Sequence, residues 1–379
     1  MRTRRWKPHP AEISLLQACL CEDPETALKG FNAWRSFQEK SQLVHAERLF
    51  PLFVAASSRH GWKDPEIESV RERLRSISMF SSIVAMHAAK LIKELQEQGR
   101  EVLILKGLAL QDIAYPASWM RPVTDCDILL TPSEANSTVG FLTESGWTTR
   151  AKLRFGPGQL AGYAGANYAR GMYEQIDVHW RLNYWSRDPD LENRMRRRAI
   201  AMTIGGTKTK TLDHTDHLLH ALAHGVAWEG GGTVTRWVAD SVYLARSGII
   251  DWDRLVDDAV RSGFGPQARE GLRFLVEQSF VEVPWSTIAA LERTRPDPIA
   301  ELAHWARNSP PTPASMLCRL FVTDYPARSA GQPMLQRIRG YPGYIVRTIS
   351  DENDSRMSGL LTGLRRGPTD RSFRAPKTK

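Results

Sequence analysis

Cysteine is scarce in this sequence, and long apolar runs are missing from it. Only four of the 379 residues are cysteine, and their spacing gives neither a disulfide framework nor a paired Cys-x-x-Cys zinc site. No run of about 18 apolar residues occurs, so we expect no transmembrane helix and no membrane partner. The basic beginning is broken by Pro8, His9, Pro10 and Glu12, where a signal peptide needs an apolar stretch. These absences predict a protein of a reducing, cytoplasmic compartment.

Excess charge is also missing from most of the chain. The formal net charge of +9 suggests a nucleic-acid partner. The first ten residues, however, hold four basic residues and no acid, and the last fifteen hold six basic residues and one acid. The rest of the chain is therefore neutral overall. We expect the basicity to belong to the two ends, which can at most tether a polyanionic partner.

What remains is the composition of a globular protein, with 42% hydrophobic and 25% charged residues. Apolar residues recur at helical spacing before residue 100 and after residue 213, and short apolar runs lie between. The expected fold class is α+β. We predict a helical N-terminal region over 1–84, an α/β core over 85–212, a helical C-terminal region over 213–363 and a disordered basic tail over 364–379.

Individual elements follow from the same patterns. Strands are predicted over 102–105, 125–130, 147–155 and 173–182, with a hairpin of 201–204 and 207–212 joined at Gly205-Gly206. Helices are predicted over 69–98, 108–115, 133–145, 215–227, 235–247, 252–262 and 267–280. The glycine-rich stretch from Gly156 to Gly171 is predicted to be a loop, either a lid over a ligand or an ordinary long turn.

Two aspartates form the sharpest motif. Asp125 and Asp127 are two residues apart on a predicted strand, so their side chains point the same way. The bland alternative is a solvated strand end. Asp177 lies on the polar face of a second predicted strand about fifty residues later. Three carboxylates from two strands can hold one or two hard cations, Mg²⁺ or Mn²⁺. Asp177 can be a metal ligand, a base for an acceptor hydroxyl, or both.

Phosphate-binding candidates lie close to these acids. Gly107 follows the strand that precedes the aspartates, and a glycine there lets backbone N–H groups approach phosphates. Lys106 and Arg121 can neutralise a triphosphate. The structural alternatives are a salt bridge for Lys106 and pairing of Arg121 with Asp125 or with its neighbour at position 127.

Taken in order, these motifs resemble a known family. The set consists of Leu105-Lys106-Gly107, Ala109-Leu110, Tyr115-Pro116, Arg121-Pro122, Asp125-x-Asp127-x-Leu129-Leu130 and Ile176-Asp177-Val178-His179-Trp180. It resembles the bacterial uncharacterised nucleotidyltransferase family of the DNA-polymerase-β-like superfamily. The likeness covers roughly residues 35 to 280 and extends weakly to His217-Leu218-Leu219-His220, His224-Gly225 and Arg236-Trp237-x-x-Asp240.

The resemblance implies a small mixed sheet with helices around it. It also implies metal carboxylates at Asp125, Asp127 and Asp177, with Mg²⁺ or Mn²⁺ as cofactor. The implied reaction is attack of an acceptor hydroxyl on the α-phosphate of a nucleoside triphosphate, with ATP expected, and release of pyrophosphate. His179 is expected to contact the nucleotide or to orient a carboxylate. The superfamily places Gly-Ser after its first strand, whereas this sequence has Lys106-Gly107.

The acceptor and the oligomeric state stay open. RNA, a peptide or protein, and a small molecule are all compatible with the motifs. A second hypothesis is a nucleotidyltransferase-like module that binds RNA or a peptide without efficient catalysis, because the Gly-Ser pair is missing. A third is a zinc hydrolase that uses His217, His220 and His224, which share one helical face. Packing of these histidines in a helix bundle is the simpler interpretation.

Three other groups have both a binding and a structural interpretation. The basic residues of 194–198 can contact an acceptor phosphate or RNA, or form a solvated face. The tryptophans can stack on bases or pack in the core. Arg236 and Asp240 are predicted to form an i,i+4 ion pair.

Overall fold

The computed structural model describes residues 6–37, 46–149, 164–183, 185–227, 235–294, 297–310, 312–328 and 334–350. The fold is α+β, as predicted, and is built on a mixed six-stranded sheet with the order β3-β4-β2-β1-β6-β5. The strands are β1 (Leu103–Leu105), β2 (Cys126–Leu129), β3 (Gly165–Arg170), β4 (Glu174–His179), β5 (Ile200–Ile204) and β6 (Thr207–Thr211).

Helices make up most of the rest of the described chain. Before the sheet come α1 (Pro10–Leu20), α2 (Pro24–Ser36), α3 (Phe50–His60) and α4 (Pro65–Glu97), and among the strands lie α5 (Lys106–Ile113), α6 (Pro132–Glu144) and α7 (Leu191–Arg198). After the sheet come α8 (His214–Gly225), α9 (Arg236–Arg246), α10 (Trp252–Ser262), α11 (Gly265–Glu277), α12 (Trp285–Arg293), α13 (Pro298–Asn308), α14 (Pro313–Arg319), α15 (Tyr325–Arg328) and α16 (Met334–Ser350).

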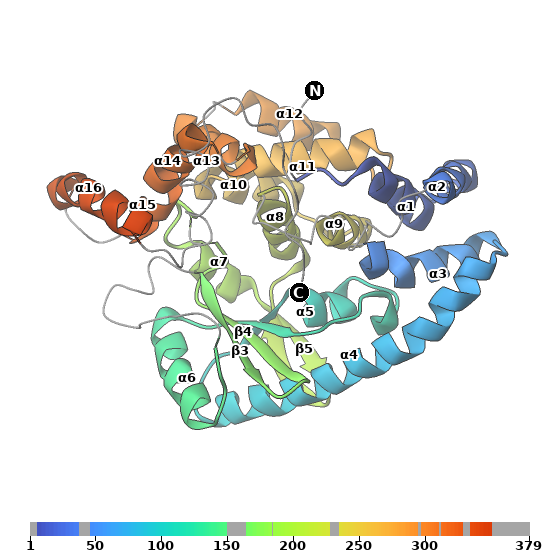
Figure 1. The fold of residues 1–379 in the computed structure, drawn as a ribbon, viewed down its shortest axis with the longest axis horizontal. Helices are drawn as coiled ribbons and strands as arrows, with labels where there is room; N and C mark the ends of the chain where they lie inside the picture. Colours follow the sequence, from blue (N-terminus) through green and yellow to red (C-terminus); the bar gives the residue numbers. More distant parts are fainter. Residues whose placement is uncertain are drawn as a thin grey trace.

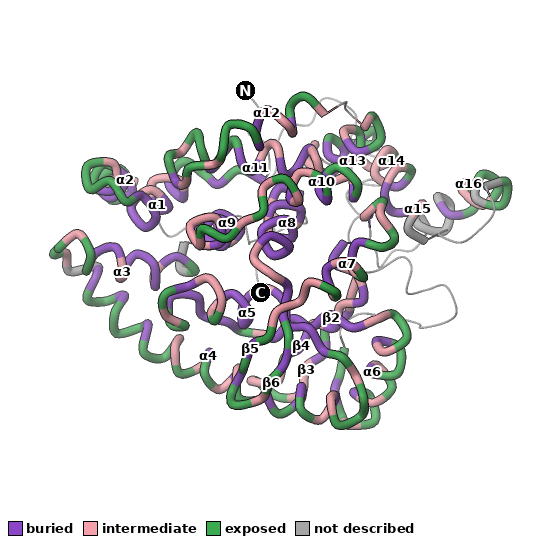
Figure 2. The backbone as a smooth tube through the Cα atoms, turned by 180° about the vertical axis from the view of Figure 1, so that it is seen from behind, coloured by how far each residue is buried: buried purple, intermediate pink, exposed green. Residues whose placement is uncertain are grey.

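One face of the sheet packs on α4 and α6. Alternate residues of the central strands, such as Ile104, Ile128 and Val178, form a core with an apolar stripe of α4 and with α6. In Figure 1, α4 runs along the underside of the sheet. Figure 2 shows buried and exposed residues alternating along this helix, as expected for a helix with one apolar face.

The other face of the sheet meets the remaining helices. Leu103, Leu105 and Leu129 belong to a second core, which they share with helices from both the N-terminal and the C-terminal parts of the chain. Figure 1 shows α8 to α13 above the sheet, on the opposite side from α4. The strand residues that alternate with the α4-facing core, Asp127 and Asp177 among them, therefore lie on the side of these helices.

Pairing between strands places the aspartates. Strand β2 pairs in parallel with β4, and this register sets Asp127 directly beside Asp177. Strand β1 pairs antiparallel with β2, with Leu105 opposite Asp127. The residue that follows β1, Lys106, therefore begins α5 close to the same point of the sheet.

Most predicted elements are confirmed within a few residues, including the hairpin, whose Gly205 and Gly206 have φ of 53° and 82°. The second strand begins at Cys126, one residue later than predicted, so Asp125 precedes it. The predicted strand over 147–155 is wrong at its start, because Thr148 forms only an isolated bridge to Ala169. Its remainder from residue 150, and the basic tail over 364–379, lie outside the described residues.

The prediction of a loop over the glycine-rich stretch is partly wrong as well. Its last part forms β3, which begins at Gly165, and Gly171 with φ of 73° lies in the turn to β4. Residues 156–163 of that loop lie outside the described residues. The boundaries of the four predicted regions stay a prediction. In the described part of the chain, no helix combines the length and the apolar character needed to cross a bilayer.

Candidate functional site

A buried carboxylate, Asp127, stands at the centre of the candidate site. It is 7% exposed and lies on β2 next to Asp177 of β4. The amide Nδ2 of Asn167, from the neighbouring strand β3, donates a hydrogen bond of 2.8 Å to Oδ1 of Asp177. Three adjacent strands thus fix the positions of these side chains, and rigid strands hold such groups precisely.

Two basic side chains contact the same oxygen of Asp127. The Lys106 ammonium donates to Oδ1 at 2.7 Å, and Nε2 of His179 lies 2.9 Å from that oxygen. Nζ of Lys106 and Nε2 of His179 are 3.5 Å apart. Lys106 has φ of 48°, a left-handed conformation that is unusual for a residue other than glycine. The salt-bridge alternative for Lys106 is therefore present in the structure.

These contacts give the three acids different affinities for protons. Burial disfavours the charged form of Asp127, but Lys106 and His179 more than offset it and lower its pKa well below the usual range. Burial, followed by repulsion from Asp127, raises the pKa of Asp177 to about 6. The same two causes raise the pKa of Asp125. Negative charge is therefore crowded at this place, which favours a cation.

The donor set fits a divalent metal ion. Among the described residues, Asp127, Asp177 and His179 form a group in which one ligand atom of each lies within 4.8 Å of the others. Carboxylate oxygens suit Mg²⁺ and Mn²⁺, and an imidazole nitrogen is compatible with Mn²⁺ or Zn²⁺. Asp125 is not part of this group. The sequence predicts that His179 contacts the nucleotide or orients a carboxylate, and its contact with Asp127 agrees with the second role. Its place among the possible metal ligands was not predicted.

Arg121 is held by a different acid from the two that the sequence suggested. Its Nε and Nη2 donate to the two carboxylate oxygens of Asp240 on α9, at 2.7 and 3.0 Å, and the hydroxyl of Tyr115 donates to the same carboxylate at 2.7 Å. Arg121 and Asp240 are both buried. The predicted pair of Arg236 with Asp240 is wrong, because Asp240 turns toward Arg121 instead. The role of Arg121 in binding a triphosphate stays a prediction.

Gly107 lies where α5 packs closely on the segment before β2. A Cβ atom at this position would lie 2.6 Å from Cγ1 of Val123 and 3.7 Å from Nη1 of Arg121. The glycine therefore has a packing reason to be there, in addition to the predicted approach of its backbone to phosphates.

Gly107→Ala is expected to lower the free energy of unfolding by about 1 to 3 kcal/mol, since the close contact forces Val123 or the helix to move. Urea denaturation measures this change. Gly140→Ala in α6 is the matched control, because nothing lies within 4 Å of its Cβ position, and the change there is neutral or stabilising by up to about 1 kcal/mol. Equal stability of the two variants would contradict the packing role.

Three of the four histidines of α8, His217, His220 and His224, share one face of the helix and pack against other parts of the protein. His217 lies 2.8 Å from Oγ1 of Thr211, and burial lowers its pKa to about 3, so it is neutral. His220 is also buried, and its ring packs edge-on against His224 at 6.0 Å. Over the described ranges, these residues are absent from any group that can hold a metal ion. The zinc hydrolase hypothesis finds no support here.

Two of the basic residues of α7 join that helix to the C-terminal helices, whereas Arg197 is exposed. Arg194 contacts Asp188 at 2.6 Å and Asp258 at 2.8 Å, and Arg198 contacts Asp216 at 2.7 Å and Asp258 at 2.9 Å. These two arginines form a network and not a solvated face. Six of the described tryptophans are buried, which favours packing over base stacking: Trp6, Trp34, Trp147, Trp180, Trp185 and Trp237.

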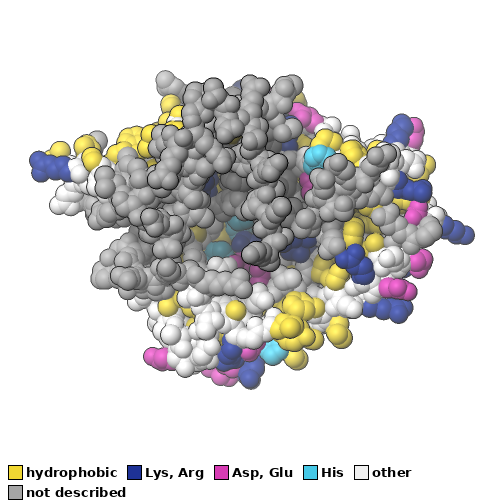
Figure 3. Space-filling view, in the orientation of Figure 1, with side chains coloured by type: hydrophobic (Ala, Val, Ile, Leu, Met, Phe, Trp, Pro, Cys, Tyr) yellow, Lys and Arg dark blue, Asp and Glu magenta, His cyan; other side chains and the backbone are white. Residues whose placement is uncertain are grey.

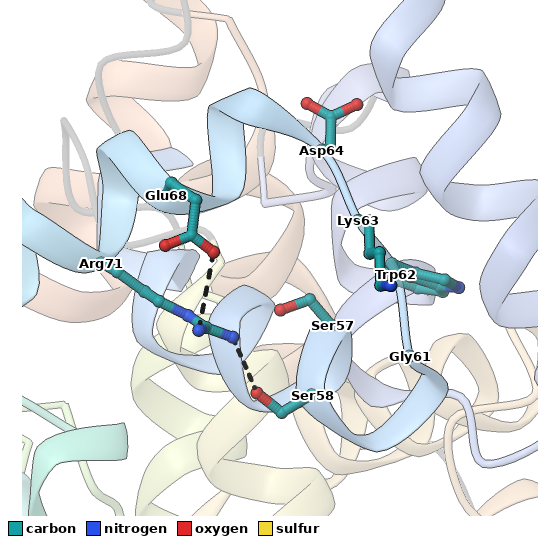
Figure 4. Close-up of a pocket in the computed structure, with 8 residues that line it drawn as sticks. All are labelled: Ser57, Ser58, Gly61, Trp62, Lys63, Asp64, Glu68 and Arg71. Atoms are coloured by element: carbon teal, nitrogen blue, oxygen red, sulfur yellow. Dashed lines mark hydrogen bonds and ion pairs between the residues drawn. The ribbon is translucent and has the colours of Figure 1, made fainter.

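The candidate site and a second hollow of the protein lie in different places. Figure 3 shows acidic, histidine and basic side chains together in a depression at the centre of the face shown. A separate cavity of about 630 Å³ lies between α3 and α4 and includes Trp62 and Glu68 in its lining. In Figure 4, Arg71 of α4 reaches Ser58 of α3 at 3.2 Å and pairs at 3.6 Å with Glu68 of its own helix. None of the predicted site residues lines this cavity.

Comparison with known proteins agrees with the motifs. One solved structure similar to this chain is that of an antigenic nucleotidyltransferase-like protein from Paracoccidioides brasiliensis, with 13% identity, coverage of 56% of this chain and 93% of that chain, and a TM-score of 0.37. No curated protein matches the sequence. The sequence pattern described as "Uncharacterised nucleotidyltransferase" matches residues 35–278, which is more than half of the chain and includes all the predicted site residues. The chain therefore belongs to the uncharacterised nucleotidyltransferase family.

Proposed function

We propose that this protein is a metal-dependent nucleotidyltransferase of the DNA-polymerase-β-like superfamily. It moves a nucleoside monophosphate from a triphosphate, with ATP expected, to an acceptor hydroxyl and releases pyrophosphate. The observation that carries the proposal is the pair of Asp127 and Asp177, side by side on parallel strands, with Lys106 and His179 around them. Family membership supports the same chemistry.

Asp125, Asp127 and Asp177 are the proposed ligands of Mg²⁺ or Mn²⁺, in a two-metal arrangement. A divalent cation at this place supplies charge neutralisation for the phosphates and orients the reacting oxygens. His179 holds Asp127 in position through the contact of 2.9 Å. Lys106 and the backbone at Gly107 bind phosphate oxygens at the beginning of α5, and Arg121 supports that segment.

The transfer step releases one proton from the attacking hydroxyl, and a base must take it. The acceptor oxygen forms a bond to the α-phosphorus, the bond from that phosphorus to the bridging oxygen breaks, and pyrophosphate leaves. Asp177 takes the hydroxyl proton, because its carboxylate lies beside Asp127 on the neighbouring parallel strand. The acceptor itself is RNA, a peptide or protein, or a small molecule. A cytoplasmic location and a bacterial source are part of the same proposal.

Removal of divalent metal is expected to abolish transfer. We expect label from an α-labelled triphosphate to enter an acceptor in a cell extract with Mg²⁺ or Mn²⁺, and to fall to background with EDTA. Gel or mass-spectrometric detection of the product, with each of the four nucleotides, identifies both substrates. Label transferred from the γ-phosphate would indicate a kinase, and undiminished transfer in EDTA would exclude the metal-dependent reaction.

One observation favours a second function, a binding module without efficient catalysis. The Lys106 ammonium contacts Oδ1 of Asp127, one of the two carboxylate oxygens available to a metal ion. Calorimetry with nucleotides, with and without Mg²⁺, separates the two functions. Binding of RNA or peptide with no metal-dependent binding of nucleotide would favour the module.

A further inference from the structure

Two guanidinium groups meet at one carbonyl beside the candidate site. Nη2 of Arg236, at the beginning of α9, donates to the carbonyl oxygen of Pro122 at 3.2 Å. Nη1 of Arg121 lies 3.5 Å from the same oxygen. Both side chains therefore converge on the segment between α5 and β2, directly before Asp125.

Their charges are balanced very differently. Arg121 has the carboxylate of Asp240 on two of its nitrogens. No carboxylate among the described residues forms an ion pair with Arg236, although the residue is partly buried. Burial, followed by the nearby charges of Arg121 and Arg48, lowers the pKa of Arg236, but a guanidinium stays protonated at neutral pH. A buried cation without a counter-ion is costly, and such a cost is typical of a site for an anion.

A third cation approaches from the N-terminal part of the chain. Arg48, an exposed residue of the short 3-10 turn Ala46–Leu49, is near enough for its charge to act on Arg121 and Asp125. The cluster thus combines three guanidinium groups with the carboxylates of Asp240 and Asp125. Three guanidinium groups against two carboxylates leave positive charge in excess on this side of the acids.

The arginine cluster lies on the opposite side of Asp127 from the proposed acceptor. Asp177, the proposed base for the acceptor, lies on β4, to one side of β2. The arginine cluster lies on the side of β1 and α5, since Nη1 of Arg121 is 3.7 Å from a Cβ placed on Gly107. An anion bound by the cluster is therefore next to the proposed phosphate-binding segment and separated from the acceptor side by Asp127.

We propose that Arg236, assisted by Arg48, binds the β- and γ-phosphates of the donor triphosphate. This inference rests on the proposed function, because it assigns the donor to that site. Arg121, whose guanidinium is held by Asp240, positions the Pro122 carbonyl and with it Arg236. Guanidinium groups bind phosphate oxygens through two parallel hydrogen bonds, and Arg236 has nitrogens free of any carboxylate for this purpose.

Calorimetry with inorganic tripolyphosphate in metal-free buffer tests the site without catalysis. We expect Arg236→Gln to weaken tripolyphosphate binding by roughly 10- to 100-fold, the effect of one lost charge-assisted contact. The affinity of Arg236→Lys for tripolyphosphate is expected to lie between those of the wild type and of Arg236→Gln. The thermal midpoint of Arg236→Gln stays the same or rises, since an uncompensated buried charge is removed, so a structural role alone does not explain the loss. Arg261→Gln, at an exposed i,i+4 pair on α10, is the control and leaves binding unchanged.

A second set of ligands assigns the phosphates to the donor. Arg236→Gln is expected to weaken the binding of a non-hydrolysable α,β-methylene nucleoside triphosphate as much as the binding of tripolyphosphate, and to leave binding of the nucleoside monophosphate unchanged. If only the binding of tripolyphosphate is weakened, the site binds another anion and the assignment to the donor is wrong. Failure of the wild type to bind tripolyphosphate, or equal binding by Arg236→Gln, overturns the inference. If Arg236→Gln loses tripolyphosphate binding but the wild type transfers no nucleotide, the proposed function is contradicted and the anion site is not.

Discussion

Asp127→Asn is expected to lower nucleotide transfer by about 10³-fold or more, the largest catalytic effect of any single substitution in this chain. Asp127 is the residue that Lys106, His179 and Asp177 all approach. Asparagine keeps the size of the side chain but removes its charge, so a divalent cation loses a ligand worth several kcal/mol in the transition state. Transfer of α-label measures the loss of activity, and electron paramagnetic resonance of bound Mn²⁺ measures the loss of metal binding.

Stability must be followed in the same variant, because Asp127 also neutralises Lys106. We expect a loss of about 1 to 3 kcal/mol in the free energy of unfolding, which leaves the protein folded at room temperature. Asp112→Asn is the matched control, since this aspartate is exposed on the neighbouring helix α5. Transfer by Asp127→Asn within about tenfold of the wild type would exclude Asp127 from the reaction.

The sequence predicts the central strands and the two aspartates because their signals are local. Short apolar runs mark β1 and β2, and strict alternation marks β4, with Ile176 and Val178 buried and Asp177 on the other face. The resemblance added that these strands belong to one mixed sheet. Alternation alone does not say which strands are neighbours. The parallel register that joins Asp127 to Asp177 depends on packing of the whole core.

The missed features depend on residues far apart in the chain. Strand β3 has a glycine at its beginning and weak strand propensity, and it forms because it pairs along its length with β4. Asn167, which contacts Asp177, was therefore missed together with its strand. No local pattern reveals that Arg121 pairs with Asp240, which is 119 residues away, whereas i,i+4 spacing made Arg236 the expected partner.

That misassigned pair also has the largest expected effect on stability. Asp240→Asn is expected to lower the free energy of unfolding by about 3 to 5 kcal/mol, because it leaves the Arg121 guanidinium buried without a counter-ion. The pair joins the segment before β2 to α9, and Tyr115 donates to the same carboxylate, so three contacts weaken together. Chemical denaturation of the purified variant measures the loss.

Two further variants separate the buried charge from the lost hydrogen bonds. Removing both partners, with Arg121→Met and Asp240→Leu in one chain, is expected to recover much of the stability, since no uncompensated charge remains. Asp257→Asn breaks an exposed pair with Arg261 and is expected to change stability by less than about 1 kcal/mol. A similarly small loss in Asp240→Asn would mean that Arg121 finds another acid, and Asp125 is the charged group near enough to act on it. In that case the arginine cluster and the metal-binding acids are one electrostatic unit, and Arg236→Gln and Asp240→Asn would no longer have independent effects on binding of tripolyphosphate.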